Sequence, residues 1–126
     1  MITIDTDVLI EILDKKSEKG DQALKQILQS GEEICTTAIN IHETLYGLHK
    51  YAKPIKEILL LPVLNSTKKD ATLSSKIELE AETKGNAVRR TDAMIAAITI
   101  NAGATLYTFD LKHFTHLKTL GLKLFP

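Results

Sequence analysis

The chain has 126 residues, and its sixteen lysine and arginine residues balance sixteen aspartate and glutamate residues. This length suits one domain, spanning 1–126, that can bury a single core without disulfides or structural metals. The balanced charge excludes a strongly basic molecule, although a local basic rim is still compatible with a nucleic-acid partner.

The composition also indicates the compartment. Cys35 is the single cysteine, so no intramolecular disulfide can form. The first apolar run carries Asp5 and Asp7, unlike a signal peptide, and no window approaches the roughly 18 apolar residues of a membrane span. We therefore expect a cytoplasmic protein without a membrane partner.

Short strands alternate with helices along the chain. Runs rich in β-branched residues favour strands, and apolar residues at helical spacing favour helices. Gly31 and Gly103 are placed as helix stops, Pro54 as the first turn of a helix, and Asn40 as a cap with Glu43 in its capping box. In chain order we expect a strand over Met1–Ile4, a helix over Val8–Asp14, a turn over Lys15–Gly20, a helix over Asp21–Gln29, a strand over Glu33–Ile39, helices from Asn40 to Tyr51 and from Pro54 to Leu61, an extended piece over Pro62–Asn65, helices over Thr67–Thr83 and Thr91–Ala102, a strand over Thr105–Phe109, a helical turn over Asp110–Leu117, and a last strand over Leu122–Phe125.

This alternation predicts an α/β fold with a mainly parallel sheet and helices on both faces. In such sheets ligands bind beyond the carboxyl ends of the strands, where the strand order reverses. Asp5 and Asp110 follow two of the expected strands, and Glu43 lies near the start of a helix. We therefore expect these acids to converge at one edge of the sheet.

Four acidic residues stand next to apolar residues at such element boundaries: Asp5, Glu43, Asp92 and Asp110. Each one alone has an ordinary explanation as a helix cap or a turn residue. Gathered in a poorly solvated cleft, however, like charges raise one another's pKa or bind a cation. Carboxylates are hard oxygen ligands suited to Mg²⁺ and Mn²⁺. The combination therefore predicts a divalent-metal site and metal-assisted phosphodiester chemistry.

Asp92 is the most informative of the four. It begins a helix whose following residues, 93–98, are all apolar or small, which indicates that the helix is buried on most faces. Arg89 and Arg90 precede it, and we expect them either to neutralise the acid or to hold substrate phosphates at the rim of the site.

Two other functions are compatible with part of the pattern. Asp5-Thr-Asp7 after a strand resembles the motif of haloacid-dehalogenase-type phosphatases, in which Asp5 would be the nucleophile and Asp7 the general acid. That interpretation needs a late acidic pair, and the sequence supplies Asp110 without an acidic neighbour. The other alternative is a non-catalytic binding module whose acidic pocket receives an arginine or lysine from a partner.

Four segments resemble motifs of the PIN-domain family, most closely those of VapC-type toxins of toxin–antitoxin pairs. The segments are Ile2–Leu9, Glu43–Gly47, Arg90–Ala97 and Thr108–Phe114. Carried over residue by residue, the resemblance implies that the catalytic and metal-binding residues are Asp5, Glu43, Asp92 and Asp110, with Thr6, Asp7 and Thr108 in supporting roles.

The resemblance also implies a PIN-like (Rossmann-like) three-layer α/β/α sandwich and an endoribonuclease that uses Mg²⁺, or Mn²⁺ in its place, to hydrolyse RNA. It further implies a homodimer and an antitoxin protein that blocks the site. Apolar faces over Ile55–Leu61 and Ala38–Tyr46 exceed the need of a small core and independently favour a dimer.

Overall fold

The computed structural model describes residues 1–126, and its centre is a five-stranded sheet in the order β3-β2-β1-β4-β5. Every neighbouring pair of strands is parallel, so the expected parallel sheet is confirmed. The strands are β1 (Ile2–Ile4), β2 (Ile34–Thr37), β3 (Val63–Leu64), β4 (Thr105–Tyr107) and β5 (Leu124–Phe125).

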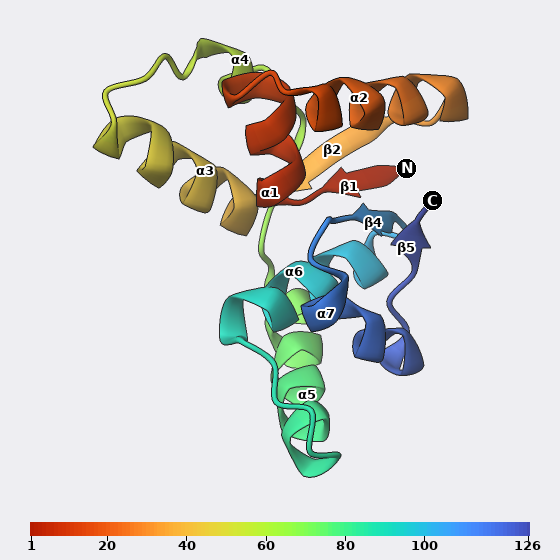
Figure 1. The fold of residues 1–126 in the computed structure, drawn as a ribbon. Coiled ribbons are helices and arrows are strands. Elements are labelled where there is room, and N and C mark those ends of the chain that lie inside the picture. The colour runs from red at the N-terminus through yellow and green to blue at the C-terminus, as the bar shows by residue number, and fades with distance from the viewer.

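Helices cover both faces of this sheet, with α1 to α4 on one side and α5 to α7 on the other (Figure 1). None of them is both long enough and apolar enough to cross a bilayer. The helical elements are α1 (Thr6–Leu9), the π-helical segment η1 (Ile10–Asp14), α2 (Glu18–Ser30), α3 (Ala38–Lys50), α4 (Lys56–Leu59), α5 (Lys68–Thr83), α6 (Arg90–Asn101), α7 (Leu111–Phe114) and the 3₁₀ helix η2 (Thr115–Leu120).

Two apolar cores lie on the two faces of the sheet. Successive strand residues point to opposite faces, and in β4 Leu106 packs into one core and Tyr107 into the other. The core beneath α5 and α6 contains Ala93, Ala96 and Ala97, which are completely buried. Because these side chains are small, α6 lies close to the sheet, and its first turn reaches the carboxyl ends of the strands.

The chain reverses its direction of travel across the sheet next to β1. From β1 it crosses to β2 and β3 on one side, and it then returns to β4 and β5 on the other side. β1 and β4 are direct neighbours, paired from Ile2 with Thr105 to Ile4 with Tyr107. Parallel sheets bind ligands at such a switch point. The residues that follow β1 and β4 therefore lie where a site is expected.

Several element boundaries differ from the sequence-based expectation. α3 begins at Ala38 and is capped by the Thr37 side chain, which accepts the backbone N–H of Asn40; the prediction that Asn40 is the cap is therefore wrong. α2 begins at Glu18, inside the expected turn, because Ser17 caps it. The helix expected from Pro54 to Leu61 is only the single turn of α4. These ends are decided by which polar side chain reaches the free amides.

Gly20 lies where α2 passes directly over the backbone of η1. A methyl group on Gly20 would lie 2.1 Å from the carbonyl oxygen of Glu11 and 2.5 Å from its carbonyl carbon. Both atoms belong to the backbone of a helical segment, which cannot move away without disturbing α1. Gly47, in α3, has nothing within 4 Å of the same position.

We expect Gly20→Ala to lower the free energy of unfolding by roughly 1–3 kcal/mol, since the clash forces the two segments apart. Gly47→Ala is the matched control and should raise the free energy of unfolding by about 0.5–1 kcal/mol, because alanine is the better helix former. Urea unfolding followed by circular dichroism measures both. Equal effects of the two substitutions would contradict the close approach.

Candidate active site at the carboxyl edge of β1 and β4

Asp5 is the buried centre of the acidic cluster. It directly follows β1 and caps α1, and only 7% of it is exposed. Its carboxylate accepts three hydrogen bonds, from the Thr6 amide at 2.9 Å, from Asn40 Nδ2 at 2.8 Å and from the Thr108 hydroxyl at 2.7 Å. These donors come from three separate segments of the chain, so the fold fixes the orientation of this carboxylate.

Glu43 is connected to Asp5 through two polar side chains. The Thr6 hydroxyl donates to Glu43 Oε1 at 2.8 Å and accepts from Asn40 Nδ2 at 3.0 Å. Asn40 is completely buried and is itself held by Thr37, whose hydroxyl donates to Asn40 Oδ1 at 2.8 Å. Asn40 therefore positions two of the acids at once.

This role of Asn40 was missed by the sequence analysis, which treated the residue as a cap. A signal was present, because Asn40 precedes Glu43 by three residues and so lies on the same face of a helix. An amide on the face that also carries the acid has to pair with something polar when the helix is buried.

Asp110 is connected to Asp5 through Thr108. The Thr108 hydroxyl donates to Asp5 and accepts the backbone N–H of Asp110 at 3.0 Å. Asp110 caps α7, and its carboxylate contacts Nδ1 of His113 at 2.7 Å. His113 is therefore a second residue beside an acid of the site that is not among the predicted site residues, and its side chain is 42% exposed.

Asp92 lies in the first turn of α6 and is 4% exposed. Arg89, which immediately precedes the helix, donates from Nε to Asp92 Oδ2 at 2.8 Å and from Nη2 to Asp110 Oδ2 at 3.3 Å. The pKa of the Arg89 guanidinium is raised above its usual value, chiefly by the hydrogen bond to Asp92 and then by the charges of Asp92, Asp110 and Glu43. The guanidinium thus interacts with three of the four acids.

Arg90 points elsewhere. It makes a two-pronged ion pair with Glu78 of α5, with both nitrogen–oxygen distances 3.1 Å. Of the two arginines expected near the acids, the structure brings only Arg89 to them. Asp7 stays close to the acids, and its carboxylate accepts the backbone N–H of Phe109, with the shorter contact 3.2 Å.

Negative charge at this edge is only partly compensated. Burial, followed by the nearby charge of Asp7, raises the pKa of Asp5 to about 6 despite its three hydrogen bonds. Burial likewise raises the pKa of Asp7, and the charge of Asp110 adds to the increase. An opposite charge nearby favours the ionised form of a carboxylate, so a cation bound at this edge would offset these increases in pKa.

The donor set fits a divalent ion in its chemistry, because the four acids offer only hard oxygen ligands and exceed the positive charge around them. The side chains are not preassembled for it, however. No three acidic, histidine or cysteine side chains are grouped closely enough to hold a metal ion as they stand. Asp92 and Asp110 are instead tied to Arg89, and Glu43 to Thr6. Metal binding therefore requires these side chains to change partners.

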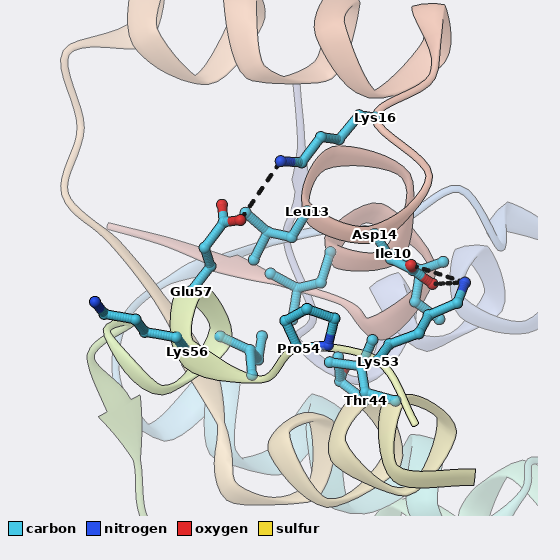
Figure 2. A pocket seen from close by; sticks show the side chains of 12 residues that line it. Ile10, Leu13, Asp14, Lys16, Thr44, Lys53, Pro54, Lys56 and Glu57 are labelled. Atoms are coloured by element: carbon cyan, nitrogen blue, oxygen red, sulfur yellow. Dashed lines mark hydrogen bonds and ion pairs between the residues drawn. The ribbon is translucent and has the colours of Figure 1, made fainter. Parts of the chain in front are cut away.

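A separate pocket of about 410 Å³ lies between η1, α3 and α4, and none of the four acids lines it. Figure 2 shows Lys53 reaching Asp14 and Lys16 reaching Glu57 at its rim. Thr44 is one of the residues that line this pocket, and its hydroxyl is buried without a hydrogen-bond partner. The pocket has an apolar floor and paired charges at the rim, which are not features of a phosphodiester-cleaving centre.

The raised pKa of Asp5 makes stability depend on pH. The folded protein holds the Asp5 proton more tightly than the unfolded chain, where the pKa is near 3.8. Its contribution to the free energy of unfolding is therefore largest below pH 4 and falls by up to about 3 kcal/mol as the pH rises through 6.

We expect Asp5→Asn to remove this dependence, so the difference in unfolding free energy between variant and wild type should move in favour of the variant from pH 4 to pH 7. Unfolding in EDTA across that range measures it. The exposed Glu80→Gln is the control, and a difference that is flat with pH for Asp5→Asn would contradict the argument.

Comparison with known proteins agrees with this geometry. Residues 2–119 match the PIN domain family, whose members are nucleases that generally use divalent metals. A comparison with curated proteins returned no match.

Solved structures share the fold over nearly their whole length. A chain of VapBC2 from Rickettsia felis, bound to a DNA fragment from its promoter, has 25% identity and a TM-score of 0.80, with 100% of both chains covered. A chain of DNA-bound VapBC from Salmonella typhimurium has 24% identity and a TM-score of 0.79, covering 98% of this chain and 96% of that one. VapC20 of Mycobacterium tuberculosis, a sarcin-ricin-loop-cleaving toxin, has 16% identity and a TM-score of 0.66, covering 92% and 95%.

The match spans nearly the entire sequence, and the acids that the family resemblance named lie at the switch point of the sheet. The chain belongs to the PIN-domain family.

Proposed function

We propose that this protein is a divalent-metal-dependent endoribonuclease that hydrolyses phosphodiester bonds of RNA and acts as the toxin of a type II toxin–antitoxin pair. One observation carries the proposal. A continuous chain of hydrogen bonds joins Glu43, Asp5, Asp110 and Asp92 through Thr6, Asn40, Thr108 and Arg89 at the switch point of a PIN fold.

The buried carboxylates are the anchors of the proposed metal site. Asp5, Asp92 and Asp110 would hold Mg²⁺, or Mn²⁺ in its place, and Glu43 would complete its shell. When bound, the ion polarises the phosphate, lowers the pKa of a coordinated water and offsets charge on the leaving oxygen. Thr108 and Asn40 keep the Asp5 carboxylate aimed at the edge of the sheet, the role that supporting residues have in metal sites.

Glu43 is also suited to accept a proton from the attacking water. Thr6 holds its Oε1, and Oε2 has no partner in the protein, so one oxygen is oriented while the other is free. A half-buried carboxylate with one oriented oxygen and one free oxygen supports this role as a general base.

Arg89 is the candidate for substrate phosphate. It is 61% exposed and touches the acids, whereas Arg90 is paired with Glu78. A guanidinium binds phosphate oxygens in a two-pronged fashion, so one arginine suffices to orient a phosphodiester. The proposal therefore assigns this role to Arg89 and leaves Arg90 in its ion pair.

RNA as the substrate is supported by the similarity to VapC20, an RNA-cleaving toxin, together with the nuclease chemistry of the family. An antitoxin partner is supported by the likeness to VapBC complexes. The pocket of Figure 2 is a candidate contact for it, because apolar side chains line it. An antitoxin that binds the protein without lowering its rate of RNA cleavage would contradict this part.

One alternative is favoured by a specific observation. The acids already accept a guanidinium, that of Arg89, so a non-catalytic module that receives a partner's arginine is compatible with the geometry. Metal binding without any turnover would favour it. The phosphatase alternative is not carried forward, because Asp7 is engaged by the Phe109 amide and the chain belongs to another family.

We expect Asp92→Asn to lower the rate of metal-dependent RNA cleavage by at least about 100-fold, since even indirect partners of a metal are worth 10–100-fold. Cleavage of a mixed RNA pool with Mg²⁺ or EDTA measures it. Glu78→Gln is the control, because it removes an acid that pairs only with Arg90. Near-wild-type cleavage by folded Asp92→Asn would sink the assignment.

We also propose a homodimer, supported by the exposed leucines of α4 and its end. Leu59 is 57% and Leu60 77% exposed, which is costly for an isolated molecule when such residues are clustered. Sedimentation equilibrium at micromolar concentration should give a dimer for the wild type and a monomer for Leu60→Glu. Leu79→Glu, at a residue of α5 that is 63% exposed, is the control and should leave the dimer intact.

A further inference from the structure

Arg89 occupies the very oxygens that the proposed metal site needs. Its Nε and Nη2 reach Asp92 and Asp110 at 2.8 and 3.3 Å, and the oxygens concerned are Oδ2 of each acid. The side chain of Asp92 is 5% exposed, and that of Asp110 is 28% exposed. Among the groups at this edge, Arg89 is the one fixed positive charge that touches two acids.

A guanidinium and a divalent cation compete for such a pair of carboxylates. Both are held by the same lone pairs, and the two cations repel each other strongly when they share a partly buried cleft. Arg89 bridges two separate acids, so it also fixes the distance between them. A bridge of this kind gives each acid a partner and so lowers the affinity of the site for a metal.

Nothing in the fold prevents Arg89 from leaving. It stands just before α6 with an extended backbone, its side chain is 61% exposed, and it makes no side-chain capping bond. Rotation of the side chain towards solvent breaks only the two ion pairs. The buried alanine-rich remainder of α6 stays in place, because those contacts involve other residues.

We propose that Arg89 competes with the divalent cation for Asp92 and Asp110. Without the cation, Arg89 bridges the two acids. When the cation binds, Arg89 releases them, and its guanidinium becomes free to bind substrate phosphate. The inference rests on the proposed function and adds to it an order of events. The Arg89 side chain cannot bridge Asp92 and Asp110 and bind a phosphate at the same time. The metal-free protein is therefore kept stable, and the substrate-binding group becomes available only in the loaded site.

The neighbouring Arg90 supplies a matched control. It carries the same charge one residue further along the chain, but it pairs with Glu78 and is 74% exposed. Removing either arginine changes the net charge equally. Only the removal of Arg89 frees the acids of the site.

The test is direct Mn²⁺ binding, followed by the electron paramagnetic resonance signal of the free ion. We expect Arg89→Gln to bind Mn²⁺ at least about tenfold more tightly than wild type, because a charge-assisted hydrogen bond that the ion must break is lost. Arg89→Lys keeps the charge but cannot bridge two carboxylates, so it should also bind more tightly than wild type. Arg90→Gln should stay within about twofold, and Asp92→Asn should lose the site.

Each of the other possible results of the Mn²⁺ binding experiment contradicts a specific part of the inference. Wild-type affinity in Arg89→Gln overturns the antagonism and leaves the metal site standing. Wild-type affinity in Arg89→Lys, with tighter binding in Arg89→Gln, shows that charge alone acts and overturns the bridge. Absence of Mn²⁺ binding in every variant overturns the inference together with the metal site of the proposed function.

A second measurement, the KM for RNA, distinguishes an Arg89 that is released to bind phosphate from an Arg89 that only stabilises the fold. At saturating Mn²⁺, Arg89→Gln should cleave RNA with a KM raised about tenfold or more, although its metal affinity is higher. A residue that only braced the fold would lower the melting temperature and leave KM unchanged. An unchanged KM would overturn the phosphate-binding part of the inference.

Discussion

Burial of carboxylates at the carboxyl edge of β1 and β4 costs free energy, to which their mutual repulsion adds, and much of the surrounding structure compensates for this cost. Asp5 is the most confined of them, and it receives hydrogen bonds from Thr6, Asn40 and Thr108. Even so, its pKa is raised to about 6, so the donors offset only part of the cost of burial. This remaining cost supports the proposed cation site, because an opposite charge nearby stabilises an ionised carboxylate.

The packing of the fold explains how the acids reach the same edge of the sheet. α6 carries Asp92 to the edge because its buried alanines allow it to lie against the sheet, and Thr108 reaches Asp5 because β4 is the direct neighbour of β1. On the other face, Gly20 allows α2 to lie on η1, which continues directly from the helix that Asp5 caps. The apolar cores thus fix the positions, and the polar chain of hydrogen bonds fixes the orientations.

The two adjacent arginines differ in the partners that their side chains reach. Arg89 is the last residue before α6 and turns towards the acids, whereas Arg90 is the first residue of the helix and turns towards α5. The backbone is extended at Arg89 and helical from Arg90, so the two neighbouring side chains leave the chain towards different surroundings. One arginine is left in an exposed ion pair of little energetic weight, and the other sits on the oxygens of the proposed metal site.

Local signals in the sequence carried much of the architecture. β-branched runs marked β1, β2 and β4, and Gly31 and Gly103 marked the ends of α2 and α6, since both adopt the left-handed backbone that favours glycine. Because these strands alternate with helices, the parallel sheet and the convergence of Asp5 with Asp110 followed from the order of elements. The resemblance to PIN-domain motifs named the same acids.

The polar partners of the acids were not predictable in the same way. Thr37 rather than Asn40 caps α3, and Asn40 instead bridges Asp5 and Thr6, because the competition between capping and burial is decided by what packs against the helix. The bridge of Arg89 between Asp92 and Asp110 joins residues separated by up to 21 positions, and its choice over Arg90 depends on the direction in which the first turn of α6 faces. The sequence by itself determined which elements form and where the acids stand along them, because helix and strand signals are local. Only the tertiary structure decided which donors meet which carboxylates, because hydrogen bonds require distances of about 3 Å that are set by the packing of segments far apart in the chain.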